Sequence, residues 1–308
     1  MSDSLFDPSK ISHPAQARSW ITRLVFGLAV ATLFLMALGS ATRVMNAGLS
    51  CPDWPLCYGE FVPRSQMNLE VFLEWFHRLI ATMIGFGTIA LVAVSWWFRR
   101  DLPKWTPWAT LLALFLVVFQ GVLGGLTVTE LLRFDIVTAH LGTGLLFFST
   151  LLTIGTLLIP YQGTGTVGKL RLVGIAATGF VYFQSILGGL VSSQWALHQC
   201  FGQSQLCTIM NSHIAGIVPP ILSVLTLVIL AWRTPALHPL LRRLINVAGL
   251  LLVLQITLGV ATFRLRLQVE PLTVAHQVTG AALLGTLLVF TVLALRDSAE
   301  GQVVKVEA

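Results

Sequence analysis

Eight apolar stretches, each long enough to cross a lipid bilayer, constrain this chain more than any other feature of its sequence. A transmembrane helix needs about 20 predominantly apolar residues. The stretches cover residues 20–42, 71–98, 106–128, 135–159, 171–192, 211–233, 243–263 and 272–295. Because 55% of the residues are hydrophobic and only 10% are charged, little polar surface is left for a water-soluble globule of 308 residues. We therefore predict an all-α integral membrane protein with eight transmembrane helices.

The basic residues predict how these helices are oriented. Lys and Arg accumulate in the cytoplasmic loops of membrane proteins. Thirteen of the 19 Lys and Arg residues fall in the two terminal tails, with Arg23 at the start of the first stretch counted among them, and in the loops 99–105, 160–171 and 233–243. We therefore expect both termini on the cytoplasmic side of a bacterial-type plasma membrane. Because the basic residues are spread over several loops and form no single stripe, the net charge of +6 does not indicate nucleic-acid binding.

Four histidines lie at matching places in the chain. His77 and His213 are 136 residues apart, and so are His140 and His276. Each histidine follows the start of an apolar stretch that runs from outside to inside, so all four are expected toward the outer side. One histidine inside a membrane is explained equally well by a hydrogen bond between helices. Four in register favour metal or heme ligation, because an ionisable residue at this depth is costly.

An internal repeat accounts for the spacing of the histidines. The segment 119–127, FQGVLGGLT, aligns with the segment 254–262, LQITLGVAT, and Gly39 aligns with Gly188 in the preceding helices. Because each repeat contains four helices, both copies enter the membrane the same way up. We predict two tandem four-helix bundles related by a pseudo-twofold axis along the membrane normal.

Each half, residues 1–160 and residues 161–308, is expected to hold one heme between two facing histidines. Structural zinc takes four protein ligands, and no set of Asp, Glu or Cys completes such a site in both halves. Heme needs fewer protein ligands because the porphyrin supplies the other four. Small residues near the sites would admit a flat macrocycle, although ordinary helix packing explains them equally well. They are Gly142, Gly144, Gly216 and Gly280.

The four cysteines form two pairs in loops that are expected outside. Cys51 and Cys57 lie between the first two helices, and Cys200 and Cys207 lie at the equivalent place in the second half. Disulfides persist in an oxidising compartment, so we predict one disulfide within each loop. Each disulfide either staples its loop over the helix ends or serves as a redox-active dithiol.

Only the first half has a carboxylate beside its histidine. Glu74 precedes His77 by three residues, which places both side chains on one face of a helix. The equivalent residue of the second half is Met210. Glu74 is therefore a candidate proton donor or acceptor. The alternative is a glutamate that favours the helix N-terminus through the macrodipole.

These features together resemble the heme A synthase family of cytochrome oxidase assembly. The resemblance rests on EWFHR at 74–78, on CPDWPLC at 51–57, on the second cysteine pair and on the four histidines. It extends over roughly 20–296. The family oxidises the C8 methyl group of heme O to a formyl group, which yields heme A. Membership would imply a membrane heme oxidoreductase.

The resemblance also implies a role for each candidate residue. His77 and His140 would ligate the substrate heme O, and His213 and His276 would ligate a heme b cofactor. The catalytic residues would be Glu74, Cys51 and Cys57. Arg78 matches the family motif and would either pair with a heme propionate or anchor the helix at the interface. The implied partners are the heme O synthase that supplies the substrate, an electron-transfer partner, the lipid bilayer and further copies of the chain in a homo-oligomer.

Two other functions compete with this interpretation. A diheme b-type cytochrome that passes electrons between quinone and an outside disulfide explains the histidines and cysteines, but not why Glu74 is confined to one half. A heme transporter or chaperone is the second alternative. A transporter is expected to have broken helices or polar residues near the bilayer midplane, whereas the ionisable residues of this chain cluster at the outer helix ends.

Overall fold

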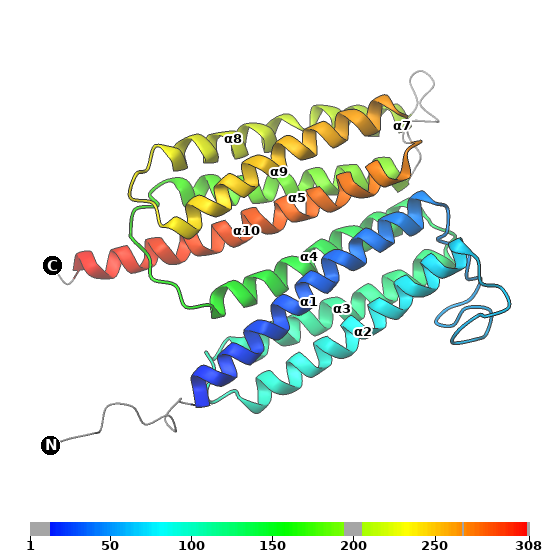
Figure 1. Ribbon diagram of the computed structural model, residues 1–308, viewed down its shortest axis with the longest axis horizontal. Helices are drawn as coiled ribbons and strands as arrows, with labels where there is room; N and C mark the ends of the chain where they lie inside the picture. The colour runs from blue at the N-terminus through cyan, green and yellow to red at the C-terminus, as the bar shows by residue number, and fades with distance from the viewer. Residues whose placement is uncertain (1–12, 194–204, 267, 307–308) are drawn as a thin grey trace.

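The structure is a computed structural model that describes residues 13–193, 205–266 and 268–306. In this part of the chain all the regular elements are helices (Figure 1). The helices are α1 (His13–Val44), α2 (Leu69–Trp97), α3 (Thr106–Thr129), α4 (Phe134–Leu158), α5 (Leu170–Ser193), α7 (Gln205–Ala215), α8 (Val218–Trp232), α9 (Pro239–Arg264) and α10 (Glu270–Val306). The all-α prediction is confirmed.

Eight spans in the described residues are long and apolar enough to cross a membrane, as predicted. The terminal helices are longer than the apolar stretches within them. Helix α1 begins at His13 and α10 continues to Val306, beyond the predicted limits 20 and 295. Hydropathy identifies the part of a helix that lies in lipid. The helical backbone hydrogen bonds of α1 and α10 continue beyond that part, so hydropathy underestimates the length of both helices.

The sixth span is broken, and the prediction of one continuous helix over 211–233 is wrong there. Helices α7 and α8 meet at a turn formed by Gly216 and Ile217. Pro219 and Pro220 follow this turn. A proline inside a helix lacks the N–H donor and clashes with the carbonyl four residues earlier.

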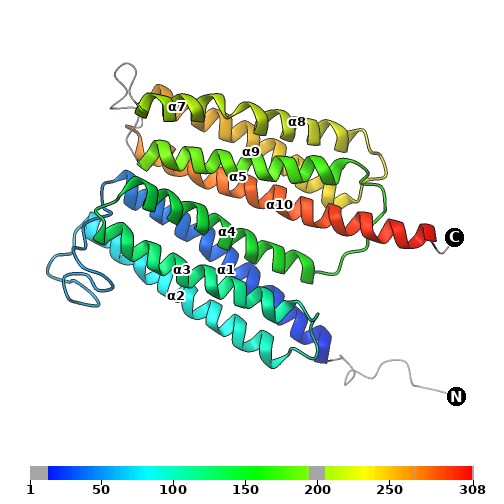
Figure 2. The same ribbon diagram turned by 180° about the vertical axis from the view of Figure 1, so that it is seen from behind.

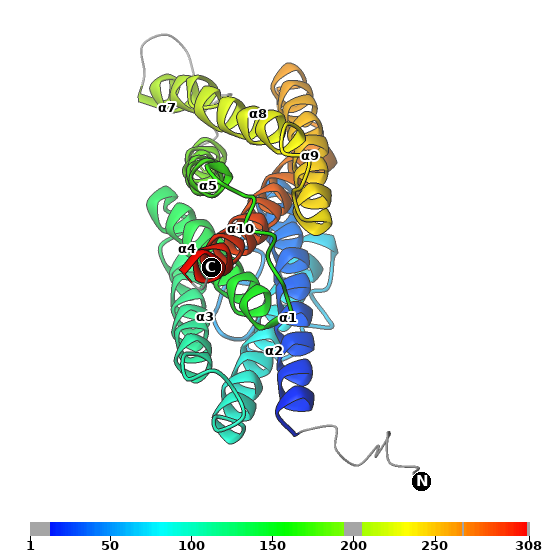
Figure 3. The same cartoon turned by 90° about the vertical axis from the view of Figure 1, so that its left-hand side faces the viewer.

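The helices lie side by side in two groups of spans. Helices α1 to α4 form one group, and α5, α7–α8, α9 and α10 form the other, as the front, back and end views show (Figures 1, 2 and 3). Helix α10 packs against α9 and α5 in its own group and against α1 and α4 in the other, and α4 also packs against α5. The symmetry axis and the boundary at 160/161 stay predictions.

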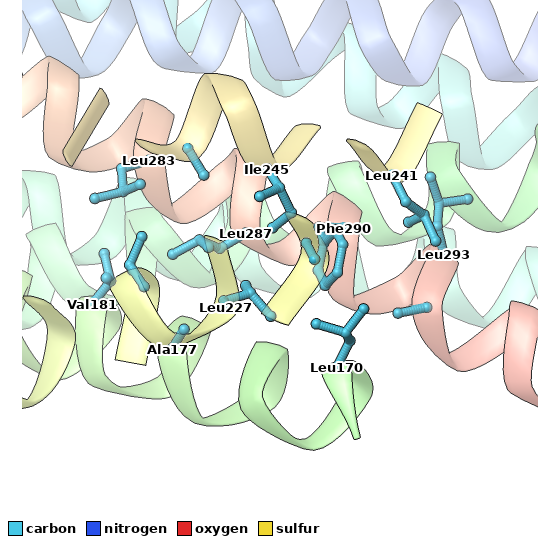
Figure 4. Packing of buried hydrophobic residues seen from close by; sticks show 14 of the residues in the cluster. Leu170, Ala177, Val181, Leu227, Leu241, Ile245, Leu283, Leu287, Phe290 and Leu293 are labelled. Atoms are coloured by element: carbon cyan, nitrogen blue, oxygen red, sulfur yellow. The ribbon is translucent and has the colours of Figure 1, made fainter. Parts of the chain in front are cut away.

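Each group of helices has its own apolar core. The larger cluster includes Leu227, Ile245, Leu287 and Phe290, which interdigitate from α8, α9 and α10 (Figure 4). Ile21, Leu91 and Leu151 belong to the cluster of the other group. Because lipid tails are as apolar as leucine, these cores stabilise the fold by close packing rather than by removing apolar surface from water.

The two ends of the molecule differ. The first residues of α1 and the last of α10 lie at one end, and the loop between α1 and α2 lies at the opposite end (Figure 1). Four tryptophans on helix ends near the α1 start are strongly exposed, and they are Trp20, Trp97, Trp108 and Trp232. Tryptophan belts of this kind mark membrane interfaces.

Candidate functional site

Glu74 and Arg78, two candidate site residues, lie close to the N-terminus of α2. Asn68 caps the helix, because its side chain accepts a hydrogen bond of 2.8 Å from the backbone N–H of Val71. The helix then presents Glu74 and Arg78 one turn apart, and they form an ion pair of 2.5 Å. Glu74 is only 4% exposed. A buried carboxylate is tolerated here because a cation and a hydrogen-bond donor compensate its charge.

This ion pair holds the loop that carries the first cysteine pair. Glu74 Oε2 accepts a hydrogen bond of 2.8 Å from the backbone N–H of Cys51. Arg78 Nη1 donates to the carbonyls of Asp53 and Leu56 at 2.6 and 2.5 Å. Arg78 therefore holds the backbone of the loop, a role that differs from both propionate pairing and anchoring at the membrane interface. The sequence did not reveal this connection between Glu74 and Cys51.

The predicted disulfide between Cys51 and Cys57 is confirmed, and both residues are buried. Asp53 shapes the same loop by accepting hydrogen bonds from the backbone N–H groups of Tyr58 and Gly59 at 2.6 and 2.8 Å. The bond from Gly59 lowers the pKa of Asp53 most, against the effect of desolvation. The pairing of Cys200 with Cys207 stays a prediction, since Cys200 lies outside the described residues.

The disulfide loop also reaches the neighbouring helix α3. A Cβ atom built on Gly125 would lie 3.2 Å from the Trp54 ring. Gly125 follows Gly124, which faces His140. The loop therefore covers the end of the first helix group opposite the start of α1, between α2 and the region of His140.

Each of the four candidate histidines packs against a glycine of an adjacent helix. A Cβ atom on that glycine would lie within 3.5 Å of the Cε1 atom of the imidazole. The distances are 2.8 Å for Gly39 and His77, 3.5 Å for Gly124 and His140, 3.1 Å for Gly188 and His213, and 2.9 Å for Gly259 and His276. These glycines leave space for the imidazole rings against the backbone, which a larger residue would take.

The contacts follow the internal repeat. Gly39 and Gly188 are equivalent in the repeat, as are Gly124 and Gly259. The sequence alignment contained these glycines but assigned them no role. The glycines for which helix packing and space for a macrocycle were equal alternatives lie against side chains of neighbouring helices, namely Ile186 for Gly142, Gln120 for Gly144, Gln184 for Gly216 and Gln255 for Gly280. The missed signal is that the helix preceding each histidine helix carries a glycine, and that these glycines occupy equivalent positions in the two halves.

The histidines of each predicted pair lie near one another, and their role as paired ligands stays a prediction. His77 and His140 are close enough to interact electrostatically, and so are His213 and His276. The Nδ1 atoms of His77, His140 and His276 are buried, and each ring lies beside a backbone carbonyl of the adjacent helix, at Leu35, Gln120 and Gln255 respectively.

The donor set fits heme better than a bare metal ion. Among the described residues, no group of three or more His, Cys, Asp or Glu side chains is arranged to hold a metal ion. Two facing imidazoles suffice for heme, since the porphyrin supplies four ligands. The residues present therefore fit a heme in each helix group.

The two pairs differ in their polar neighbours. In the second group, Gln184 Nε2 lies 3.0 Å from His213 Nδ1, and Gln255 Nε2 lies 3.4 Å from His276 Nε2. In the first group, Gln120, the repeat equivalent of Gln255, donates its hydrogen bond to Thr143. Glutamine amides thus contact the second pair, whereas the first pair lies beside the disulfide loop and its carboxylate.

Substituting a glycine that faces a histidine is expected to lower heme content. In Gly259→Ala the new methyl group would lie 2.9 Å from His276 Cε1, and overpacking of this kind costs about 1–3 kcal/mol. Helix propensity favours alanine by up to about 1 kcal/mol, so the helix itself should not suffer. The check is heme per protein after purification. Gly249→Ala, on the same helix with only an ordinary contact at 3.5 Å, is the matched control and should keep full heme content.

Removing the Arg78 side chain is expected to release the disulfide loop. Arg78→Gln loses the ion pair to Glu74 and two short hydrogen bonds to loop carbonyls. Added protease should therefore cut between residues 51 and 57 at least several times faster than in the parent protein. The exposed Arg64 lies in the same loop, so Arg64→Gln is the control. Equal cleavage of both variants would show that Arg78 does not hold the loop.

Fold and site together define a class of protein: an integral membrane protein of eight spans with two histidine pairs suited to heme. The chain belongs to the COX15-CtaA family, described as Cytochrome oxidase assembly protein, which it matches over residues 22–288. This range contains all four histidines and both cysteine pairs.

Curated relatives align along most of the chain. The heme A synthase of Shewanella oneidensis is 28% identical to it, and the alignment covers 88% of this chain and 94% of the relative. The heme A synthase of Caulobacter vibrioides is 26% identical, with coverages of 86% and 93%. A heme A synthase of Bacillus pumilus is 27% identical over 148 residues, 46% of this chain. The first two alignments show that the likeness includes both helix groups.

Proposed function

We propose that this protein is a heme A synthase, a membrane oxidoreductase that converts heme O to heme A by oxidising the C8 methyl group to a formyl group. One observation carries the proposal. Four histidines face glycines at repeat-related places, and a carboxylate that is hydrogen-bonded to a disulfide loop accompanies the first pair, whereas Met210 stands at the equivalent position of the second half. Relatives named heme A synthase, which align along nearly the whole chain, support it.

The two histidine pairs are assigned different hemes. His77 and His140 ligate the substrate heme O, since Glu74 and the Cys51–Cys57 loop lie on their side of the molecule. His213 and His276 ligate a resident heme b. The support for the second assignment is the glutamine amides beside these rings and the lack of a carboxylate at the position equivalent to Glu74.

The protein residues position the substrate and manage protons. The hemes supply the redox chemistry when bound. Trp54 and the rest of the disulfide loop cover the outer side of the first pair and keep water away. Glu74 lies one turn from His77, where it can accept a proton released during methyl oxidation. Cys51 belongs to the same catalytic unit, because its backbone N–H donates to Glu74.

We place the protein in a bacterial-type plasma membrane, with both termini in the cytoplasm and both heme sites toward the outer side. The basic loops near the termini support this orientation. Its partners are heme O, the heme O synthase that releases it, an electron-transfer protein or quinone, and further copies of the chain in a homo-oligomer.

Extraction of the pigment from purified protein tests this function against its rivals. Cells that also express a heme O source should yield protein containing heme b together with heme O or heme A. Heme b alone would favour a diheme cytochrome. A protein free of heme would favour a transporter, to which the break between α7 and α8 gives some structural support.

A further inference from the structure

We propose that Arg43 binds a carboxylate of a heme, a porphyrin propionate, at the contact between the two helix groups. The inference rests on the proposed function in that it takes heme to be the ligand. It adds a residue outside the histidine pairs to the heme site and assigns it a recognition role.

Arg43 is connected to a neighbour of one histidine in each pair. It stands one turn after Gly39, on the face of α1 where Gly39 contacts His77. Its Nη2 atom donates a hydrogen bond of 2.6 Å to Oε1 of Gln277, and Gln277 directly follows His276 in α10. The guanidinium group therefore lies near residues that belong to both sites.

The charge of Arg43 lacks an acidic partner in the described part of the chain. The ion pairs there involve Arg78 and Arg133, and the hydrogen-bond acceptor of Arg43 among the described residues is the neutral Gln277. Arg43 is partly buried, and a cation removed from water is costly unless an anion compensates it. A guanidinium has five donors in a planar fork, which suits a carboxylate.

The repeat shows that helix packing does not require this charge. The equivalent of Arg43 is Ser192, whose hydroxyl donates to the carbonyl of Gly189 in its own helix at 3.0 Å. The equivalent of Gln277 is Leu141, which packs against Gly189. The contact between α4 and α5 is therefore made without a cation. A charge retained only at the contact between α1 and α10 points to a ligand there.

The other arginines expected on this side are less suitable. Arg78 is hydrogen-bonded to the disulfide loop, and Arg133 is paired with Asp135 at 2.6 Å. Arg264 and Arg266 are exposed, so water already solvates their charges. Arg43 combines partial burial with a position beside both histidine pairs.

Both hemes carry propionates, so the experiment has one arm for each. The variant is Arg43→Gln in the full chain. In the first arm the protein is made without a heme O source, and the midpoint potential of its heme b is measured. Loss of a nearby cation favours the ferric form, so this potential should fall if Arg43 binds the resident heme. In the second arm heme O is titrated, and its Kd should rise about tenfold or more if Arg43 binds the substrate.

Two further variants separate recognition from structure. Gln277→Leu removes the hydrogen bond between the helices but keeps the cation, so it should change either quantity less than Arg43→Gln. Arg264→Gln removes an exposed charge and should match the parent protein. If Arg43→Gln does not accumulate, Arg43→Lys keeps the charge without the planar fork, and a smaller change in the same arm is expected.

Unchanged values in both arms would overturn the proposal, as would equal effects of Gln277→Leu and Arg43→Gln. Failure of the parent protein to make heme A would refute the proposed function instead. The midpoint potential and the heme O affinity would still decide the role of Arg43.

Discussion

His276→Ala and His213→Ala are each expected to remove the resident heme b from the purified protein. Each histidine supplies one of two axial ligands, and alanine leaves a space beside Gly259 or Gly188 that provides no replacement. The pyridine hemochrome signal per protein should fall to a small fraction of the parent value. The amount of protein in the membrane should stay the same, because the apolar core of α8, α9 and α10 is unaffected.

Two controls make this result specific. His238→Ala removes a histidine that caps α9 by accepting a hydrogen bond from Leu240, so it should weaken the helix end without loss of heme. His77→Ala should keep heme b, since His77 belongs to the other pair. Full heme b content in both His213→Ala and His276→Ala would contradict the assignment of the second pair.

Glu74→Gln is expected to lower heme A production by a factor of about 100 or more, the range for loss of a general acid or base. The glutamine keeps an oxygen that can accept from the Cys51 N–H, so the disulfide loop should retain most of its position. It loses the charge and the ability to take up a proton. The measurement is the ratio of heme A to heme O in cells that supply heme O, together with heme b per protein.

Two variants distinguish catalysis from loop anchoring in this experiment. Glu70→Gln changes an exposed carboxylate one turn earlier in α2 and should leave production unchanged. Arg78→Gln releases the loop while it keeps the carboxylate, and it should lower production less than Glu74→Gln. If Glu74→Gln makes heme A at the parental rate, Glu74 only stabilises the N-terminus of α2 through the helix macrodipole. Loss of heme b in the same variant would make its role structural.

The sequence predicts the membrane spans well because they depend on a simple signal, and the internal repeat is equally plain in the sequence. Hydropathy identifies a span wherever some 20 apolar residues occur together. The offset of 136 residues identifies His213 as the repeat equivalent of His77, and this does not depend on how the helices are packed. The Cys51–Cys57 disulfide also follows from short spacing, since the partner is always within reach.

Contacts that depend on helix rotation were not predictable in the same way. Which glycine faces His77 is decided by how α1 is turned against α2, and the sequence pattern alone did not identify Gly39 in this role. The bond from Arg43 to Gln277 joins residues 234 positions apart and has no counterpart in the repeat. The break at Gly216 could have been predicted, because Pro219 and Pro220 were visible in the sequence.

Formation of heme A in cells tests the central claim most directly. A host that makes heme O but has no heme A synthase of its own would express the parent protein or the double variant His77→Ala, His140→Ala. The hemes extracted from the membranes would then be separated by chromatography and identified by mass spectrometry. The account predicts heme A with the parent protein and only heme O and heme b with the double variant. If the parent protein contains its full heme b and neither strain makes heme A, the account is contradicted.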